Sequence, residues 1–386
     1  MEAPHLYRQL LTQLSQWVQP KDQRHLKGCA EIVAAILQSE HACLSRWLPY
    51  LSHRACSARA HMQRLSYFVH HKGITAETFY DPLIRRCLTG FEGEKVTLTL
   101  DTSMLWDQFC LIEICVAWGG RSLTLAQTVI EHGSAMVGFQ DYSPLLERVL
   151  KLLPTGCKVT LLADRGFEHG KLLRWLQEHH WSWAIRAKSD LLVTLPNGRT
   201  QAVRDLIPPV REAKLFHHVT VLSDVHCHLA TARIEAGADF WAVLSYQPTS
   251  LDSFTLYGQR FGGIEPHFKD YKSAAFEVTD SRLRDATALT CLFMLLDIAY
   301  LIAWMLGVRV VQLGELPRLD WHSHRGLSFL QLGLRELTTL CYQRLPLPWL
   351  GQLPCKSPPA ACASKRKRIL QELLINFSSR VTLVSA

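Results

Sequence analysis

Three acidic residues stand at positions from which they could hold divalent metal ions. Asp101 follows the apolar run in TLTLD, Asp164 ends the run VTLLAD, and Glu265 stands directly before a proline. Mg²⁺ prefers oxygen ligands and is usually held by a few carboxylates. Two such ions can activate a water or a 3′-hydroxyl and neutralise charge on a pentacoordinate phosphorus. The three residues are therefore candidates for phosphodiester cleavage without a covalent intermediate.

The third acid is expected at the start of a helix. Pro266 fits a first helical turn, and the helix dipole there favours the negative charge of Glu265. Lys269 and Lys272 lie four and seven positions further on, along the same helical face. This face could hold a metal and grip phosphates at once. The alternative is an exposed helix with a Glu-Lys pair, just as the two aspartates could be ordinary turn or cap residues.

The elements that position these acids follow from the hydrophobic pattern. Alternation begins at Lys95, and the Gly119-Gly120 pair predicts a hairpin between the next two strands. Later segments predict, in order, a helix (144–153), a strand (158–164), a helix (168–180) and a strand (181–187). This order is typical of an α/β, ribonuclease-H-like core. In such a core the first and fourth strands are neighbours, so Asp101 and Asp164 would lie close together.

Five regions are predicted along the chain. Helical spacing indicates an all-helical N-terminal domain that binds DNA or a dimer partner, short alternating runs indicate a β-rich insertion, and the basic run at Lys365–Arg368 indicates a flexible tail. In order, the regions are the helical domain (1–92), the first part of the core (93–189), the insertion (190–256), the second part of the core (257–345) and the tail (346–386).

Composition narrows the class of protein. The chain has 386 residues, 48% of them hydrophobic, and a net charge of +8, which suggests a polyanionic partner or only a soluble surface. Its twelve cysteines are scattered without a Cys-x-x-Cys pair, and its first residues lack a secretory pattern, so reduced thiols in a cytosol are expected. The phosphate-loop and dinucleotide motifs are absent, which leaves a nucleotide cofactor unsupported.

Two further segments allow alternative interpretations. Residues 287–307 are apolar enough to span a bilayer, but Asp297 interrupts them, so a buried core helix is favoured over a membrane span. His226 and His228 share a strand face, with His217 and His218 nearby, and could bind zinc. That pattern brings only two ligands together, so polar or phosphate-facing histidines are favoured.

Three segments together resemble one family. The segments LDTS, LLADRGF and Y-x-x-R...I-E-x-x-F-x-x-x-K-S resemble the DDE transposases of bacterial insertion sequences that carry a Tyr-Arg-Glu-Lys signature. The resemblance covers roughly residues 25–340, including LGLRELTTL near its end. It implies a ribonuclease-H-like core with Asp101, Asp164 and Glu265 as the metal-binding triad.

The same resemblance implies roles for nearby residues. Tyr257, Arg260 and Lys272 match the Tyr, Arg and Lys that contact DNA near the active site. The family usually places three residues between the Arg and the Glu, whereas four intervene here. We expect Gly262-Gly263 to absorb the extra residue as a bulge before the helix.

Three other side chains are candidates for DNA contact. Arg165 and Lys188 are cations at the ends of core strands and could face DNA. In such transposases the insertion can place an aromatic residue against an extruded base, and Trp241 is the candidate. The alternative is a tryptophan packed within the insertion's own core.

The resemblance implies cut-and-paste movement with two Mg²⁺ ions, for which Mn²⁺ could substitute. Double-stranded DNA would be cleaved at the element's inverted repeats, through a hairpin or by another route, and the freed 3′-hydroxyl would attack target DNA. A homodimer in the bacterial cytoplasm, associated with the nucleoid and not with a membrane, is expected. The alternatives are a nuclease on the same core without strand transfer, a non-catalytic DNA-binding relic and, from a different class, an integral membrane protein.

Overall fold

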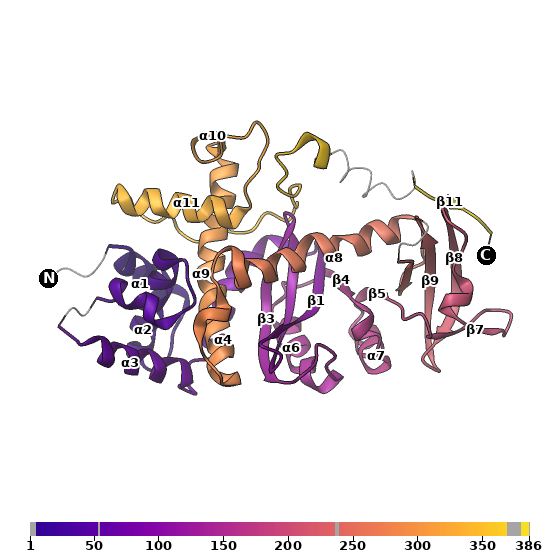
Figure 1. Cartoon of the computed structure of the whole chain (residues 1–386), viewed down its shortest axis with the longest axis horizontal. Helices are drawn as coiled ribbons and strands as arrows, with labels where there is room; N and C mark the ends of the chain where they lie inside the picture. Colours follow the sequence, from indigo (N-terminus) through magenta and orange to yellow (C-terminus); the bar gives the residue numbers. More distant parts are fainter. Residues whose placement is uncertain (1–4, 53–54, 236–238, 369–379, 386) are drawn as a thin grey trace.

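The structure is a computed structural model, and it describes residues 5–52, 55–235, 239–368 and 380–385. One large sheet runs through the molecule, with N-terminal helices at one end and the inserted strands at the other (Figure 1). Helix α8 crosses this sheet, and helix α9 stands between the sheet and the N-terminal helices (Figure 1). The fold is mixed α/β, as the sequence predicts.

The first 92 residues are helical where they are described. The α-helices are α1 (His5–Trp17), α2 (Gln23–Ser39), α3 (Ala58–His70), α4 (Ala76–Phe79) and α5 (Asp81–Leu88). Buried residues such as Leu10 and Val33 belong to the same hydrophobic core as the strands and α9. The helical prediction is confirmed, and these helices share their core with the rest of the chain.

The predicted order of the core is confirmed. Strands β1 (Lys95–Leu105), β2 (Phe109–Trp118) and β3 (Arg121–Glu131) form an antiparallel meander. Gly119 and Gly120 connect β2 to β3 with φ angles of +62° and +75°, which only glycine adopts readily. Then follow α6 (Phe139–Leu152), β4 (Lys158–Ala163), α7 (Gly170–Glu178) and β5 (Ser182–Arg186). Strand β4 pairs in parallel with both β1 and β5, so the first and fourth strands are neighbours.

The β-rich insertion extends this same sheet. Its strands are β6 (Leu192–Thr194), β7 (Thr200–Ala202), β8 (Glu212–Val221), β9 (Val225–Arg233) and β10 (Trp241–Ser245). The sheet order is β3-β2-β1-β4-β5-β10-β9-β8-β6-β7, with β10 antiparallel to β5. A last short strand, β11 (Thr382–Leu383), pairs with β8. The insertion therefore continues the catalytic sheet beyond β5.

Helix α8 differs from its prediction. It spans Asp252–Lys269 and continues into a π-helical turn at Asp270–Ala274, so Glu265 lies near its end and Pro266 lies inside it. The predicted helix start at Glu265 is wrong, and so is the predicted bulge, because Gly262 and Gly263 continue the helix. The physical reason is tertiary packing: Phe254 and Tyr257 are buried against the sheet and hold the earlier turns in place.

Helix α9 (Ala286–Gln312) contains the apolar segment for which a membrane span was the alternative prediction. The helix is long and apolar enough to cross a membrane, but its apolar 18-residue stretch is 100% buried inside the protein. The N-terminal helices α2 and α3, strand β3 and helix α11 (Phe329–Tyr342) pack around it. The buried-helix interpretation is confirmed.

Asp297 lies at the middle of α9, where the Tyr271 hydroxyl donates a hydrogen bond to its carboxylate. Burial raises the pKa of Asp297 from 3.8 to about 7, and the hydrogen bond from Tyr271 only partly opposes this. The folded protein therefore keeps a proton that the unfolded chain releases, so this residue lowers stability as pH rises from about 4 to 7. An Asn at this position has no such proton to release.

We therefore expect Asp297→Asn to be more stable than the wild type by a margin that grows between pH 5 and pH 7. Urea unfolding at both pH values measures this margin, with the exposed Asp252→Asn as control. A margin that shrinks with rising pH would contradict the buried, protonated state of Asp297.

Helices α9 and α11 cross in very close contact. A Cβ atom added at Gly333 would lie 1.5 Å from the carbonyl oxygen of Ala303, and one at Gly307 would lie 1.9 Å from that of Phe329. Gly333→Ala must push the helices apart, so we expect the free energy of unfolding to fall by about 3 kcal/mol or more. Gly258→Ala is the matched control, because its added methyl meets nothing within 4 Å. Chemical denaturation of both variants checks this, and an unchanged Gly333→Ala would contradict the close crossing.

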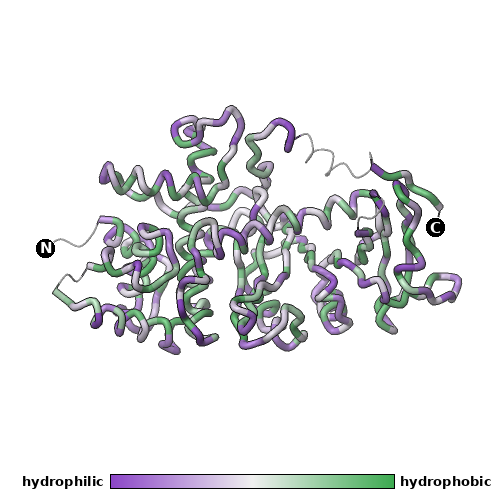
Figure 2. The backbone as a smooth tube through the Cα atoms, in the orientation of Figure 1, coloured by the Kyte–Doolittle hydropathy of each residue, from purple (hydrophilic) through white to green (hydrophobic). Residues whose placement is uncertain are grey.

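The predicted flexible tail is wrong for the part that follows Pro346. Gln13 donates to the carbonyl of Leu347 (3.0 Å), the Leu353 amide donates to Cys87 (2.8 Å), and Trp118 donates to Pro354 (2.8 Å). Composition could not reveal these contacts, which fasten the segment to the core. The basic run Lys365–Arg368 forms a hydrophilic helical turn beyond it (Figure 2), and residues 369–379 lie outside the described part of the chain.

Candidate active site

Asp101 and Asp164 lie side by side on neighbouring parallel strands. The β1–β4 register pairs Leu100 with Ala163, which makes the two aspartates the next residues in line. Asp164 directly follows β4, and its carboxylate accepts a hydrogen bond of 2.7 Å from the Gly166 amide. This hydrogen bond caps the turn after β4 and holds the Asp164 carboxylate at the strand end. Asp164 can therefore cap the turn and still offer its carboxylate to a metal ion.

Asp101 is buried, with 7% of its surface exposed. One carboxylate oxygen accepts from the Thr102 amide at 2.9 Å, and the other lies 2.6 Å from a guanidinium nitrogen of Arg260. Burial raises the pKa of Asp101 to about 6, the nearby Arg260 lowers it, and the charge of Asp164 raises it again. The ionised form is thus costly unless a cation lies beside it.

Helix α8 brings Arg260 and Glu265 to the same place. The second terminal nitrogen of Arg260 lies 3.8 Å from Glu265, whose side chain is 55% exposed. One guanidinium therefore lies between the buried Asp101 and the exposed Glu265. Because five residues span about 500° of helix, Glu265 projects about 140° around the axis from Arg260, and the long arginine side chain bridges the difference.

Asp101 and Glu265 flank the positive charge of Arg260, with Asp164 beside Asp101, and the three acids do not converge on one point. Among the described residues, two other sets place three ligand atoms within 4.8 Å of one another: Glu113, Cys115 and His267, and His41, Glu277 and Asp280. Arg260 lies where Asp101 and Glu265 would approach each other. The donor set, all carboxylate oxygens gathered around a cation, suits a divalent ion once Arg260 withdraws.

The predicted DNA-contacting residues of the insertion and α8 are largely inside the protein. Tyr257 is 1% exposed, and its hydroxyl has no hydrogen-bond partner within the described residues. Trp241 is half-buried, and its ring packs edge-on against Phe254, Tyr257 and Phe261. This packing favours the structural interpretation of Trp241, although against α8 and not within the insertion's own core.

The predicted cations occupy different positions around the acids. Lys272 donates a hydrogen bond of 2.8 Å to the carbonyl of Met104, three residues beyond Asp101 on β1. Arg165 and Lys269 are exposed. Lys188 is half-buried, and its backbone amide donates to the carboxylate of Glu168 at 2.6 Å. Lys272 thus joins Arg260 as a second predicted cation that contacts strand β1.

A buried acidic residue that the sequence pattern did not single out lies on the same side of the sheet. Glu113 on β2 is the direct cross-strand partner of Asp101, and burial raises its pKa. Glu168, next to the Asp164 turn, is also buried, and its pKa is raised to about 6. A carboxylic acid inside the apolar run FCLIEICVAW was the signal that could have revealed Glu113.

Asp101 and Asp164 on adjoining strands, with Glu265 from the crossing helix, offer the oxygen ligands that divalent ions take in enzymes that cleave or transfer nucleic-acid strands. Residues 113–302 match the family model described as the transposase DDE domain. The chain therefore has the DDE domain of a transposase and is an enzyme of DNA transposition, a class that acts on DNA with divalent metal ions. The matched segment includes Asp164 and Glu265 and begins after Asp101.

Among solved structures, the piggyBac transposase synaptic complex with hairpin DNA, determined by cryo-electron microscopy, is similar at 12% identity with a TM-score of 0.45. The alignment covers 97% of this chain and 82% of that one. No curated protein matches the sequence. The family assignment thus depends on the DDE domain match.

Proposed function

We propose that this transposase cleaves double-stranded DNA at the inverted repeats of a bacterial insertion sequence and joins the freed 3′-hydroxyl to target DNA. Asp101, Asp164 and Glu265 would hold two Mg²⁺ ions, with Mn²⁺ able to substitute. The observation that supports this is that Arg260 bridges Asp101 and Glu265, while Asp164 lies beside Asp101 on the neighbouring strand. Asp101 is buried, so this is not an ordinary surface ion pair.

The bound ions would supply an activated nucleophile and would neutralise charge on phosphorus. Asp101 contributes a carboxylate that burial leaves poorly hydrated and therefore in need of a cation. Arg260 then leaves Asp101 and pairs with a DNA phosphate, a partner that its planar guanidinium fits equally well. Lys272, Lys269 and Arg165 would bind the backbone phosphates that flank the scissile bond.

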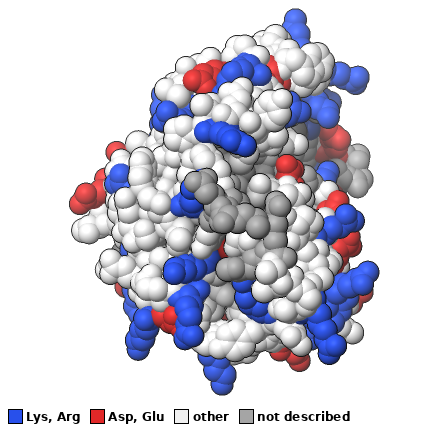
Figure 3. Space-filling view, turned by 90° about the vertical axis from the view of Figure 1, so that its left-hand side faces the viewer, with Lys and Arg blue, Asp and Glu red and all other residues white. Residues whose placement is uncertain are grey.

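The rest of the DNA would be bound by the ends of the molecule. We propose that residues 1–92 form a DNA-binding or dimerisation domain, in a homodimer that works in the bacterial cytoplasm. Lys and Arg are distributed over the face that the N-terminal helices build (Figure 3). Trp241, Tyr257 and Phe261 line a pocket beside α8 where an extruded base could stack. Lys188 would face DNA beyond β5.

A product assay tests this function directly. Purified protein with Mg²⁺ is incubated with linear DNA that carries the element's terminal repeats, together with a supercoiled target plasmid. We expect excised ends and products in which those ends are joined to the plasmid. Cleavage without joined products would replace the proposal with a plain nuclease, and binding without cleavage would replace it with a non-catalytic relic.

A further inference from the structure

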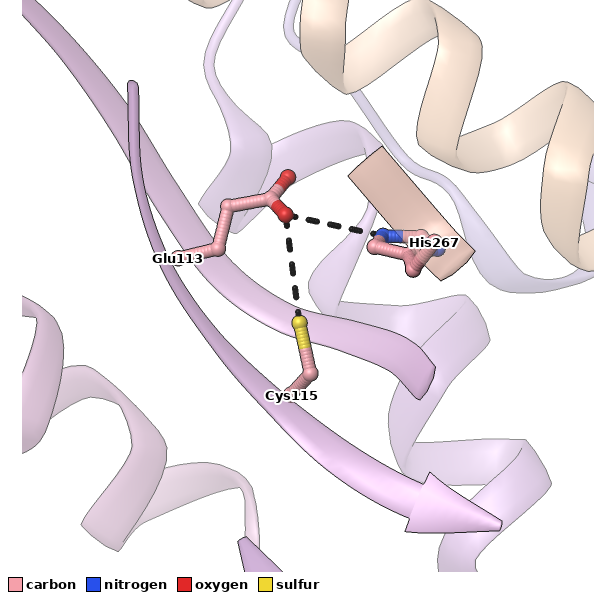
Figure 4. Close-up of side chains that lie close together, drawn as sticks. All are labelled: Glu113, Cys115 and His267. Atoms are coloured by element: carbon pink, nitrogen blue, oxygen red, sulfur yellow. Dashed lines mark hydrogen bonds and ion pairs between the residues drawn. The ribbon is translucent and has the colours of Figure 1, made fainter. Parts of the chain in front are cut away.

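A second group of ligand-type side chains lies beneath α8, separate from the three catalytic acids. Glu113 and Cys115 alternate on β2 and point to the same face, and His267 on α8 points down to meet them (Figure 4). Glu113 Oε2 lies 3.6 Å from His267 Nε2 and 4.0 Å from Cys115 Sγ. The side chains of Glu113 and His267 are 0% exposed, and Cys115 is equally buried.

Two polar atoms of this group lack partners. Glu113 Oε1 and His267 Nδ1 have no hydrogen-bond partner within the described residues. His267 Nε2 faces the carboxyl group of Glu113, and an imidazole nitrogen is a common zinc ligand. A buried polar atom without a hydrogen-bond partner lowers stability, and a bound ion can remove part of this cost.

We propose that Glu113, Cys115 and His267 bind one structural Zn²⁺ ion. Carboxylate oxygen, thiolate sulfur and imidazole nitrogen are the three donor types that zinc takes in proteins. With bonds of about 2.0–2.3 Å and tetrahedral angles, neighbouring ligand atoms lie roughly 3.3–3.8 Å apart, so the observed 3.6 Å and 4.0 Å need only small side-chain rotations.

The charge balance supports a divalent ion at this site. Glu113 and Cys115 supply one carboxyl group and one thiol to the site. Binding releases both protons to solvent, and one carboxylate and one thiolate then neutralise Zn²⁺ completely. The Thr124 hydroxyl lies 3.1 Å from His267 Nε2 and can complete the coordination as a neutral fourth ligand.

The position of this site gives it a role in the active site above it. Glu113 pairs across the strands with Asp101, and His267 lies two residues after Glu265 on α8. An ion here fastens α8 to β2 and so fixes the helix that carries Arg260 and Glu265. The three acids bind hard, exchangeable ions through oxygen alone, whereas this set contains sulfur and nitrogen, so the two sites differ in metal preference.

The test uses the full chain, expressed with zinc supplied and dialysed against EDTA to strip weakly held ions. Elemental analysis is expected to find one zinc per chain in the wild type and in Asp101→Asn. Protein prepared with Co²⁺ in place of zinc is expected to show thiolate-to-cobalt charge-transfer absorption. Cys115→Ser is expected to lose that absorption, whereas Cys110→Ser, which changes another buried cysteine on the same strand, keeps it.

The wild-type spectrum decides the question even if Cys115→Ser fails to fold. Substoichiometric zinc together with no thiolate–cobalt absorption in the wild type would overturn the proposal and leave Glu113 as a protonated, buried acid. An absorption that persists in a folded Cys115→Ser would also overturn it, because the thiolate would then come from elsewhere. The result is independent of the product assay, since metal content is measured without DNA.

Discussion

Replacing Asp101 with asparagine is expected to abolish DNA cleavage and joining while leaving DNA binding in place. The amide cannot supply the negative charge that a divalent ion needs, and the ion contributes several kcal/mol of transition-state stabilisation. At 1.36 kcal/mol for each factor of ten, the rate should fall at least about a thousandfold. The measurement is the initial rate of end cleavage with saturating Mg²⁺, alongside the DNA affinity of the same protein.

Asp107→Asn provides the matched control for this variant. Asp107 lies in the exposed turn that follows β1, and its positive φ of 55° is one that asparagine tolerates. It should cleave DNA at the wild-type rate. If Asp101→Asn retained wild-type activity, the first acid of the proposed triad would be misassigned, whatever the outcome for the other two.

Replacing Arg260 with alanine is expected to cause the largest loss of stability among the charged residues of the site. Arg260 is 5% exposed, and its guanidinium is the charged partner of the buried Asp101. Removing one partner of a buried pair leaves an uncompensated charge, which typically costs about 3–5 kcal/mol. Urea unfolding without divalent ions measures the loss, and added Mn²⁺ should restore part of it by replacing the positive charge.

A double-mutant cycle separates the ion pair from simple loss of packing. Arg260→Ala combined with Asp101→Asn should be clearly more stable than the sum of the two single variants predicts, because neither charge is then left alone. Arg174→Ala, which breaks the exposed pair with Asp224 at 2.7 Å, is the control and should cost about 1 kcal/mol or less. Strict additivity of Arg260→Ala and Asp101→Asn would mean that the two side chains do not interact in solution.

Local sequence pattern was sufficient to predict much of the core. The alternation from Lys95 and the apolar run before Asp164 predicted two strands, and their order along the chain predicted that they are neighbours. That neighbourhood is what places Asp101 beside Asp164. These predictions succeeded because strand period and crossover handedness are local physical rules.

The remaining features depend on contacts between distant segments. Pro266 suggested a helix start, but the packing of Phe254 and Tyr257 extends α8 across the sheet and places the proline inside it. Likewise, Leu353 in the predicted flexible tail is buried, which composition alone did not indicate. The local propensity of a residue for a helix or a loop is a weak preference, and burial against distant segments readily overrides it.

The candidate active site likewise combines features that the sequence predicts with features that depend on contacts between distant segments. Sequence alone gave each acid separately, and the family resemblance was needed to connect Glu265 with the two aspartates. The sequence did not predict that Arg260 bridges Asp101 and Glu265, because this contact depends on where α8 lies over β1. The contact between Glu113 and His267 was not predicted either. The two residues are far apart in the chain, and no local spacing relates them.

The most direct test of the central claim is a structure of the protein with a terminal-repeat DNA and Mn²⁺, with the ions located by anomalous scattering. We predict two manganese ions bound by Asp101, Asp164 and Glu265, with the Arg260 guanidinium moved from Asp101 onto a DNA phosphate. Manganese bound elsewhere on the protein, with Arg260 still paired to Asp101 while DNA is bound, would contradict the account.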